Sequence, residues 1–313
     1  QESLSSGNAF DNGFLKSLKV LFTTADSSVG SSQSVQLIQH VEAQDCQLFK
    51  YGTSNAVDLT LAFWYKSNVT GTHIVTLDKP DSTRTTCPVE FTVSSSGTWE
   101  HKVLNFNAND TIKGSSGAIV NDNGTGLRII WNLLYGSDYA SGTNGSWTQG
   151  GTGHFTTSNQ QNIGGSNNNY VEVTGVQLEV GQFTSSTLPP FQHESYGDNL
   201  ARCQRYFLFT GDGDAYQSHG TGVEVSSTVA YCNIPLATPM RATPSVSKED
   251  ALVIFDGNGE SAITSLGNVY YSKSGTVVQL AVTASGGGLS DNAGAIVYST
   301  NDSASGFLID AEL

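Results

Sequence analysis

The sequence predicts an all-β protein of two domains that are joined by a short helix. Three observations lead to this prediction. Apolar and polar residues alternate over many short runs, which is the pattern of half-buried strands. Only 13% of the residues are charged, while Gly, Ser, Thr and Asn are abundant. Long surface helices are therefore not expected, because they depend on charged, helix-favouring residues. The 313 residues suffice for two domains, each with its own core.

The first domain is predicted over residues 1–191. Leu59, Leu61, Phe63 and Tyr65 share one face of a strand, and the run from Leu127 to Leu133 repeats this alternation. Further strands are expected at 35–41, 73–77, 89–93, 100–106 and 170–180. So many short strands favour a sandwich or jelly roll. Residues 135–169, rich in Gly, Ser, Thr, Asn and Gln, are expected to form a long surface excursion.

Pro189 and Pro190 interrupt regular hydrogen bonding and end the first domain. Ser195 stands three residues before Asp198, an arrangement typical of a capping box, so a linker with a short helix is predicted over 192–207. The second domain, 208–313, is predicted as a smaller β-sandwich. Its strands are expected at 223–234, 245–255, 268–273, 276–283, 293–299 and 306–311.

The net charge of −14 argues against nucleic acid and anionic membranes as partners, because both carry negative charge themselves. No apolar window approaches the length of about 18 residues that a membrane-spanning helix needs. The four cysteines show no CxxC spacing, which argues against zinc and redox sites. We expect mostly buried thiols, with a Cys46–Cys87 bridge as the open alternative.

Glycan binding requires aromatic faces that stack on sugar rings, together with amides and carboxylates that meet hydroxyl groups. The excursion supplies these residue types. Trp147 is the first candidate for an exposed aromatic, since no strand alternation surrounds it. The alternative is that Trp147 anchors the loop on the sandwich. Tyr139 and Asp138 are further candidates by the same reasoning.

No catalytic residue is nominated, because neither GxSxG nor HExxH occurs. The chain is therefore expected not to be an enzyme, with a glycan hydrolase as the residual alternative. No cofactor is expected either. Asp212-Gly213-Asp214 and the run from Asp256 to Glu260 have calcium-ligand types at alternating positions. Neither completes a calcium loop, so both are interpreted as Asp-Gly turns, with calcium as the lesser alternative.

Two adjacent motifs carry a family resemblance. The segment from Val173 to Gly181, VTGVQLEVG, resembles the "TGVQLEVG" strand of a large family of tailed-phage tail-fibre and virion structural proteins. The segments 190–197, PFQHESYG, and 200–207, LARCQRYF, are similar to that family's "PFEHRSYGEELALCQRYY" junction. Weaker similarities at 59–67, 98–100, 239–244 and 310–313 extend the resemblance over nearly the whole chain.

The resemblance implies a first domain of jelly-roll type, similar to carbohydrate-binding modules, in a family whose members often carry further strands upstream. It also implies a homo-oligomer, expected to be a homotrimer, located in the virion together with other virion proteins. The expected function is that of a tail-fibre or spike subunit that attaches to a host-surface polysaccharide or protein. The alternatives are a capsid-decorating protein, head fibre or other structural component without a ligand, and a glycan-degrading tailspike.

Overall fold

The computed structural model describes residues 1–313 except 212, 272–274, 287, 291, 302–303 and 313. The chain is predominantly β, as the sequence predicted, and forms two compact units, Gln1–Gln192 and His193–Leu313. Several sequence predictions reach into the undescribed positions: the end of the strand predicted at 268–273, Gly287, Asp212 of one calcium candidate and the C-terminal Leu313. These positions lie outside the described residues.

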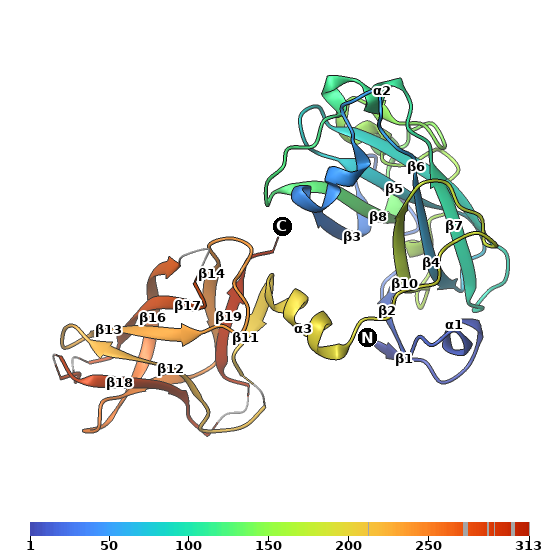
Figure 1. The fold of residues 1–313 in the computed structure, drawn as a ribbon. Helices are drawn as coiled ribbons and strands as arrows, with labels where there is room; N and C mark the ends of the chain where they lie inside the picture. Colours follow the sequence, from blue (N-terminus) through green and yellow to red (C-terminus); the bar gives the residue numbers. More distant parts are fainter. Residues whose placement is uncertain (212, 272–274, 287, 291, 302–303, 313) are drawn as a thin grey trace. The chain divides into compact units, whose positions relative to one another are not determined.

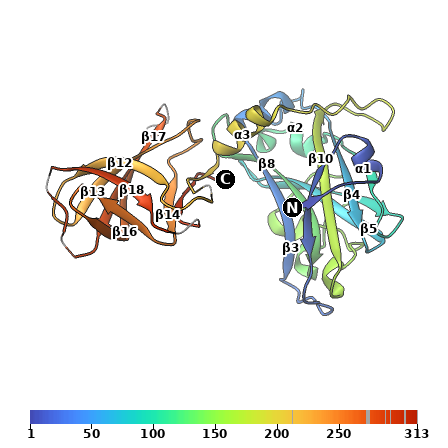
Figure 2. The same cartoon turned by 90° about the horizontal axis from the view of Figure 1, so that it is seen from below.

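The first unit contains two antiparallel five-stranded sheets (Figures 1 and 2). The first sheet has the order β1 (Glu2–Ser3), β2 (Lys16–Leu21), β10 (Tyr170–Val180), β4 (Leu59–Ser67) and β7 (Glu100–Phe106). The second sheet has the order β3 (Ser34–Glu42), β8 (Thr125–Tyr135), β5 (Gly71–Lys79), β6 (Thr85–Val93) and β9 (Thr148–Gln149). The strands β7 and β10 begin and end where the sequence predicted.

One hydrophobic core lies between these two sheets. It combines Phe63 and Tyr65 of β4 with Leu77 of β5 and with Ile129 and Trp131 of β8. The register places Leu77 opposite Ile129, so both point to the same side of the second sheet. The alternation read from the sequence therefore selects the side chains that face the core.

Short helical segments connect the strands of the first unit. The α-helical ones are α1 (Asn8–Asp11) and α2 (Asp110–Lys113), and the 3-10 turns are Ala43–Phe49, Ser115–Gly117, Ser137–Tyr139, Gly151–His154 and Ile163–Gly165. Asn109 caps α2 by accepting hydrogen bonds from the backbone N–H groups of Thr111 and Ile112. The last three 3-10 turns and β9 give the predicted excursion its local structure.

The second unit begins with the predicted helix, α3 (Tyr196–Gln204). The Ser195 hydroxyl accepts a hydrogen bond from the Asp198 backbone N–H at 3.2 Å and donates one to the Asp198 carboxylate at 2.6 Å. The capping pair proposed from the sequence is therefore present. A three-stranded sheet of β11 (Phe207–Phe209), β19 (Gly306–Asp310) and β14 (Ser245–Glu249) follows.

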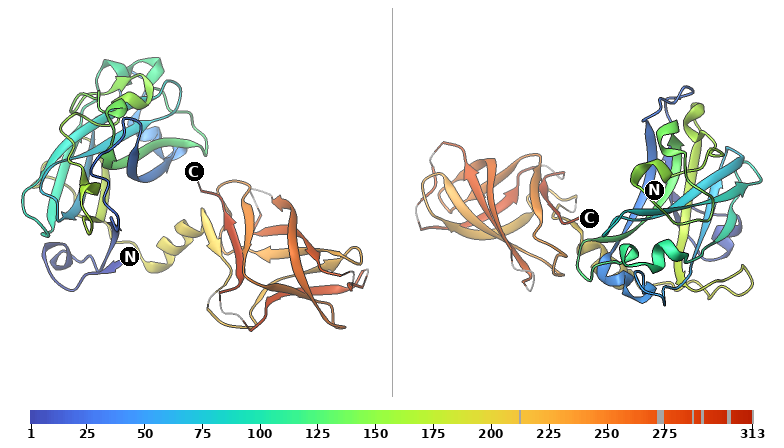
Figure 3. Two further views of the ribbon diagram at one scale, coloured as in Figure 1. Left: turned by 180° about the vertical axis from the view of Figure 1, so that it is seen from behind. Right: turned by 90° about the horizontal axis from the view of Figure 1, so that it is seen from above.

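The rest of the second unit is a closed six-stranded barrel, not the predicted sandwich (Figure 3). Its strands, in order of pairing, are β12 (Ser218–Glu224), β13 (Val229–Pro235), β17 (Val277–Ala284), β16 (Glu260–Tyr271), β15 (Leu252–Phe255) and β18 (Gly294–Ser299). Two segments that were each predicted as one strand are two strands. The run 223–234 turns back on itself after Glu224, and 245–255 breaks at Asp250, whose φ of 50° lies in the left-handed region.

Candidate functional site

A cleft of about 230 Å³ lies on the face of the second sheet that is turned away from the core. Several strands contribute to it, together with the excursion that follows β8. Its lining residues include Gln36, Arg84, Arg128, Tyr135, Tyr139 and Phe155. The cleft therefore combines three aromatic rings, two guanidinium groups and one amide, with Ile130 as an apolar part of the lining.

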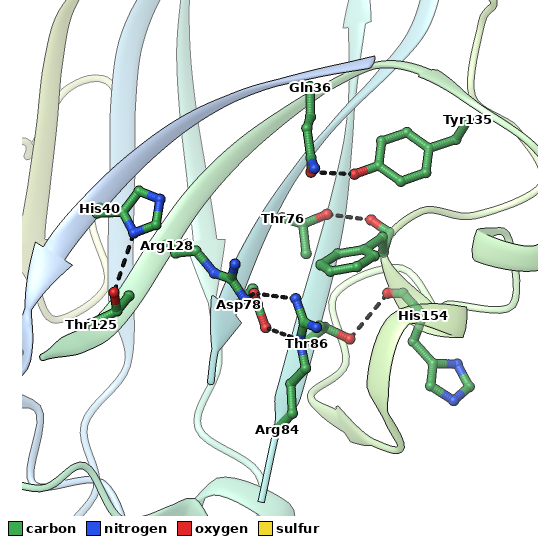
Figure 4. Close-up of polar contacts among 11 residues, drawn as sticks. Gln36, His40, Thr76, Asp78, Arg84, Thr86, Thr125, Arg128, Tyr135 and His154 are labelled. Atoms are coloured by element: carbon green, nitrogen blue, oxygen red, sulfur yellow. Dashed lines mark hydrogen bonds and ion pairs between the residues drawn. The ribbon is translucent and has the colours of Figure 1, made fainter. Parts of the chain in front are cut away.

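The strand alternation explains why these residues meet. In β8 the core takes Leu127, Ile129 and Trp131, so Arg128 and Ile130 point to the opposite face. Asp78 stands opposite Arg128 in the pairing of β5 with β8. The charged residues of two strands are thereby brought side by side on the cleft face (Figure 4).

Asp78 holds both arginines (Figure 4). Nε and Nη2 of Arg84 donate to the two carboxylate oxygens at 3.0 and 2.9 Å, and Nη2 of Arg128 contacts Oδ2 at 2.6 Å. The Asp78 side chain is fully buried, whereas Arg84 and Arg128 retain side-chain exposures of 28% and 21%. Asp78 thus fixes the two cations, whose outer edges reach the solvent of the cleft.

The aromatic rings form a connected cluster. Tyr135 and Tyr139 meet edge to face with ring centroids 5.3 Å apart, and Tyr135 lies 6.0 Å from Phe155. The Tyr135 hydroxyl donates to Oε1 of Gln36 at 2.6 Å. Burial, and next the negative charge of Asp78, raise the pKa of Tyr135, so this hydroxyl stays protonated. The guanidinium of Arg84 lies over the Phe155 ring at 4.6 Å from its centroid.

Backbone anchors hold the excursion in place beside the cleft. The Phe155 carbonyl accepts hydrogen bonds from the Thr76 hydroxyl and, at 3.0 Å, from the amide of Asn132. The Thr86 hydroxyl donates to the His154 carbonyl at 3.1 Å. Because Thr76, Thr86 and Asn132 are buried residues of regular strands, they hold Phe155 on a rigid support.

The three candidates from the sequence occupy different environments. Tyr139 lines the cleft, half-buried, with its hydroxyl donating to the Ser32 carbonyl at 3.1 Å. Asp138 is exposed, and its carboxylate accepts a hydrogen bond from Ser31 at 3.1 Å. It does not belong to the lining of the cleft.

The expectation of an exposed face at Trp147 is wrong, and the alternative of a loop anchor holds. The side chain of Trp147 is 1% exposed and packs edge to face on Tyr51 with centroids 5.6 Å apart. Its carbonyl accepts a hydrogen bond from Asn109 at 3.0 Å. Burying the large apolar surface of a tryptophan is favourable, so an isolated tryptophan in a polar loop packs against the nearby core.

Sequence reasoning missed Asp78, Arg84 and Arg128. The sequence held one signal for Arg128: it alternates with the apolar residues of the strand predicted at 127–133, which indicates a side chain on the face away from the core. Its partner could not be found this way, because Asp78 lies about 50 residues earlier and meets it only through the register of β5 and β8. His40, opposite Arg128 on β3, continues the same face and contacts Thr125 at 3.3 Å.

The other sequence candidates have structural surroundings of their own. Cys46, Cys87 and Cys232 are buried free thiols and Cys203 is an exposed one, so the alternative Cys46–Cys87 bridge does not form. At the second calcium candidate, Asp256 accepts hydrogen bonds from the backbone N–H groups of Asn258 and Gly259, as in an Asp-Gly turn. Within the part of the chain that the structure describes, no three His, Cys, Asp or Glu side chains are grouped for a metal ion.

Comparison with known proteins finds no protein-family model that matches the chain and no curated protein that matches its sequence. Among the described residues, no helix has the length and apolarity that crossing a bilayer requires. The chemistry of the cleft and the motifs in the sequence are therefore the basis for a functional proposal.

Proposed function

We propose that this chain is a structural protein of a tailed-phage virion, a tail-fibre or spike subunit whose first unit binds a glycan on the host surface. The observation that carries the proposal is the cleft on the second sheet, with Tyr135, Tyr139 and Phe155 beside Arg84 and Arg128. Glycan sites combine aromatic faces with a few fixed polar groups, and the cleft supplies both on a rigid support. The first unit is proposed to be a jelly roll of the carbohydrate-binding-module type, and to bind without catalysis.

The phage assignment is supported by the two motifs, and contacts between them suggest why they occur together. In the "TGVQLEVG" strand, the amide of Gln177 donates at 3.0 Å to the carbonyl of Pro189, the residue directly before the second motif. Phe14 packs against Gly175 of that strand and meets Phe191 of the second motif edge to face at 4.9 Å. The motif residues thus hold the end of the first unit together, which is a structural role that a family can share whatever its ligands.

The experiment titrates the full chain with purified bacterial lipopolysaccharides and capsular polysaccharides and measures heat of binding, beside binding to whole bacterial cells. We expect binding to weaken about fivefold or more in Tyr139→Ala, since loss of stacking on one aromatic ring costs on the order of 1 kcal/mol. Tyr216→Ala removes a tyrosine that is 65% exposed in the second unit and serves as the control. Failure of the wild-type chain to bind any of these surfaces would contradict the proposal.

Self-association into a homotrimer is part of this proposal, and α3 supports it. None of its residues is buried, and Tyr196 and Leu200 are 82% and 38% exposed. Tyr196, Leu200 and Cys203 follow each other at spacings of four and three residues, as in the apolar seam of a coiled coil. We expect Leu200→Glu to convert an oligomer into a monomer in light scattering, while Asn199→Glu leaves the mass unchanged. A wild-type chain that is monomeric at high concentration would refute this part.

A purely structural role in the particle is the second candidate, and an apolar groove of about 160 Å³ favours it. The groove lies between strands β2 and β10 of the first sheet and β3 of the second, and it is lined by Leu18, Leu37, Ile38, Trp131 and Val176 among others. Leu18 is 49% exposed and Val176 is 37% exposed. Locating the chain in intact particles separates the two candidates: a distal appendage favours attachment, and a position against the capsid shell favours decoration.

A further inference from the structure

We infer that the cleft of the first unit recognises an acidic saccharide, through a sugar carboxylate that binds beside Arg84 and Arg128. This inference rests on the proposed glycan binding and deepens it by naming the ligand class. The observations that carry it are the charge balance of the Asp78 cluster, the supply of hydrogen-bond donors in the cleft and the fixed orientation of one guanidinium.

The charge of the cluster is positive in a chain that is strongly negative. Arg84 and Arg128 share the single carboxylate of Asp78, so one positive charge remains at the cleft. The chain as a whole carries −14. A polyanion would therefore be repelled by most of this protein, and its binding requires a specific local site rather than general attraction.

The donors in the cleft outnumber the acceptors. Each guanidinium has about five N–H donors. Asp78 accepts hydrogen bonds from Nε and Nη2 of Arg84 and forms an ion pair with Nη2 of Arg128. Nε of Arg128 is buried without a hydrogen-bond partner, so the donors that a ligand can reach are the exposed N–H groups of the two guanidinium ends. The side-chain oxygen of Gln36 accepts a hydrogen bond from the Tyr135 hydroxyl at 2.6 Å, which leaves it one further lone pair. A ligand that satisfies this cleft must consequently bring acceptor atoms, and a carboxylate offers about four lone pairs on two oxygens.

Asp78 and Phe155 prepare the arginines for such a ligand. The bidentate contact with Asp78 fixes the plane of the Arg84 guanidinium, and the Phe155 ring lies 4.6 Å from it. An arginine held in this way loses little conformational entropy when it binds a carboxylate. The tyrosine rings beside it, Tyr135 and Tyr139, are then placed to contact the pyranose ring that carries the carboxylate.

The experiment compares acidic oligosaccharides with the same molecules after their carboxyl groups have been reduced to alcohols. The probes are oligosaccharides of glucuronate, galacturonate and N-acetylneuraminate, titrated calorimetrically into the full chain at constant salt. We expect at least one acidic probe to bind at least about tenfold more tightly than its reduced counterpart, because reduction removes the charge-assisted hydrogen bonds between the carboxylate and the arginines. The comparison needs no change in the protein, so it does not depend on a variant that folds.

Variants then assign the effect to the cleft. Arg128→Gln and Arg84→Gln should each weaken binding of the acidic probe about tenfold while leaving the weaker binding of the reduced probe nearly unchanged. Arg202→Gln, at a 72% exposed arginine of α3, should change neither. Equal affinity for acidic and reduced probes would overturn the inference and leave the proposed glycan binding standing. Absence of binding to every glycan, including the envelope polysaccharides, would overturn both.

Discussion

Asp78 and Arg128 face each other across β5 and β8, and their side chains meet at 2.6 Å on the outer face of the second sheet. Arg84 approaches the same carboxylate from the segment before β6, at 2.9 Å. Asp78 is fully buried while both arginines reach the surface. The pair therefore links the stability of the sheet to the chemistry of the cleft, and removing the acid affects both.

Asp78→Asn should destabilise the first unit. It removes the counter-charge of two partly exposed guanidinium groups and places an amide where a buried carboxylate accepted their contacts, so we expect a loss of about 2 to 3 kcal/mol. Chemical denaturation of the wild type and the variant measures the difference. Asp138→Asn changes an exposed carboxylate nearby and should cost less than about 0.5 kcal/mol. Equal stability of the two variants would contradict the structural role of Asp78.

Lys79→Met should also destabilise the first unit. Lys79 is fully buried, and its ammonium group has four carbonyl acceptors within reach of its three N–H donors, those of Asp81, Thr83, Ser116 and, farthest away, Ala118. Methionine fills the space but leaves these acceptors without their donor, so we expect a loss of about 2 to 4 kcal/mol. The exposed Lys50→Met is the matched control in denaturant unfolding. A Lys79→Met variant as stable as this control would show that the carbonyls find other donors.

Acid should weaken the first unit through His73. Its Nε2–H donates to the Val69 carbonyl at 3.0 Å, and its Nδ1 accepts from the Tyr65 hydroxyl at 2.9 Å. Burial lowers the pKa of His73 to about 4, from about 6.5 in an unfolded chain. Between these values the unfolded chain binds a proton that the folded chain does not. The contribution of His73 to the stability is therefore fully present above pH 6.5 and is lost as the pH falls towards 4.

The expected loss over this interval is about 3 kcal/mol. Denaturation curves from pH 7 to pH 4 measure it. His73→Gln keeps a donor and an acceptor but cannot titrate, so its stability should vary less with pH by that amount. His193→Gln, at an exposed position, should retain the wild-type dependence. An unchanged pH profile in His73→Gln would refute the assignment.

Gly175→Ala should test the contact between the motif strand and Phe14. Gly175 has a φ of +60°, and a Cβ there would lie 2.5 Å from Cζ of Phe14. The backbone conformation alone costs about 1 kcal/mol in a non-glycine residue. The clash should raise the total to about 2 to 4 kcal/mol.

Gly145→Ala is the matched control for this experiment. Gly145 has a φ of +72°, and nothing lies within 4 Å of the position that a Cβ would take. Alanine at this position therefore loses stability through the backbone conformation alone, without a clash. Both variants are compared by thermal unfolding, and Phe14→Ala is combined with Gly175→Ala to relieve the contact. If Gly175→Ala costs no more than Gly145→Ala, the packing of Phe14 on the motif strand contributes nothing to the fold.

Local patterns sufficed for many elements of this fold. The alternation at 100–106 and 170–180 predicted β7 and β10 to the residue, and Ser195 with Asp198 predicted the start of α3. These signals lie within a few residues of each other. The run 223–234 was predicted as one strand because apolar residues continue on both sides of the turn at Ser226 and Ser227, so the hairpin between β12 and β13 was missed.

In the candidate site, too, local patterns were predictable from the sequence and contacts between distant residues were not. Tyr139 could be proposed because composition alone marks the excursion, but Trp147 could not be assigned to core or surface until its neighbour Tyr51 was placed. The two arginines of the cleft had no interpretation until the register set Arg128 opposite Asp78. Contacts between residues far apart in sequence depend on pairing register, which a single sequence does not display.

The sequence by itself determined that this is a β protein of strongly acidic charge, with many of its strands at predictable positions and a helix capped by Ser195. Strand periodicity and capping are short-range effects, and they act before the chain is folded. Only the tertiary structure decided that six strands close into a barrel, that Trp147 is buried and that Asp78 joins two arginines beside three aromatic rings. Those outcomes depend on which strands pair and which surface each loop covers, so they arise only when distant segments pack together.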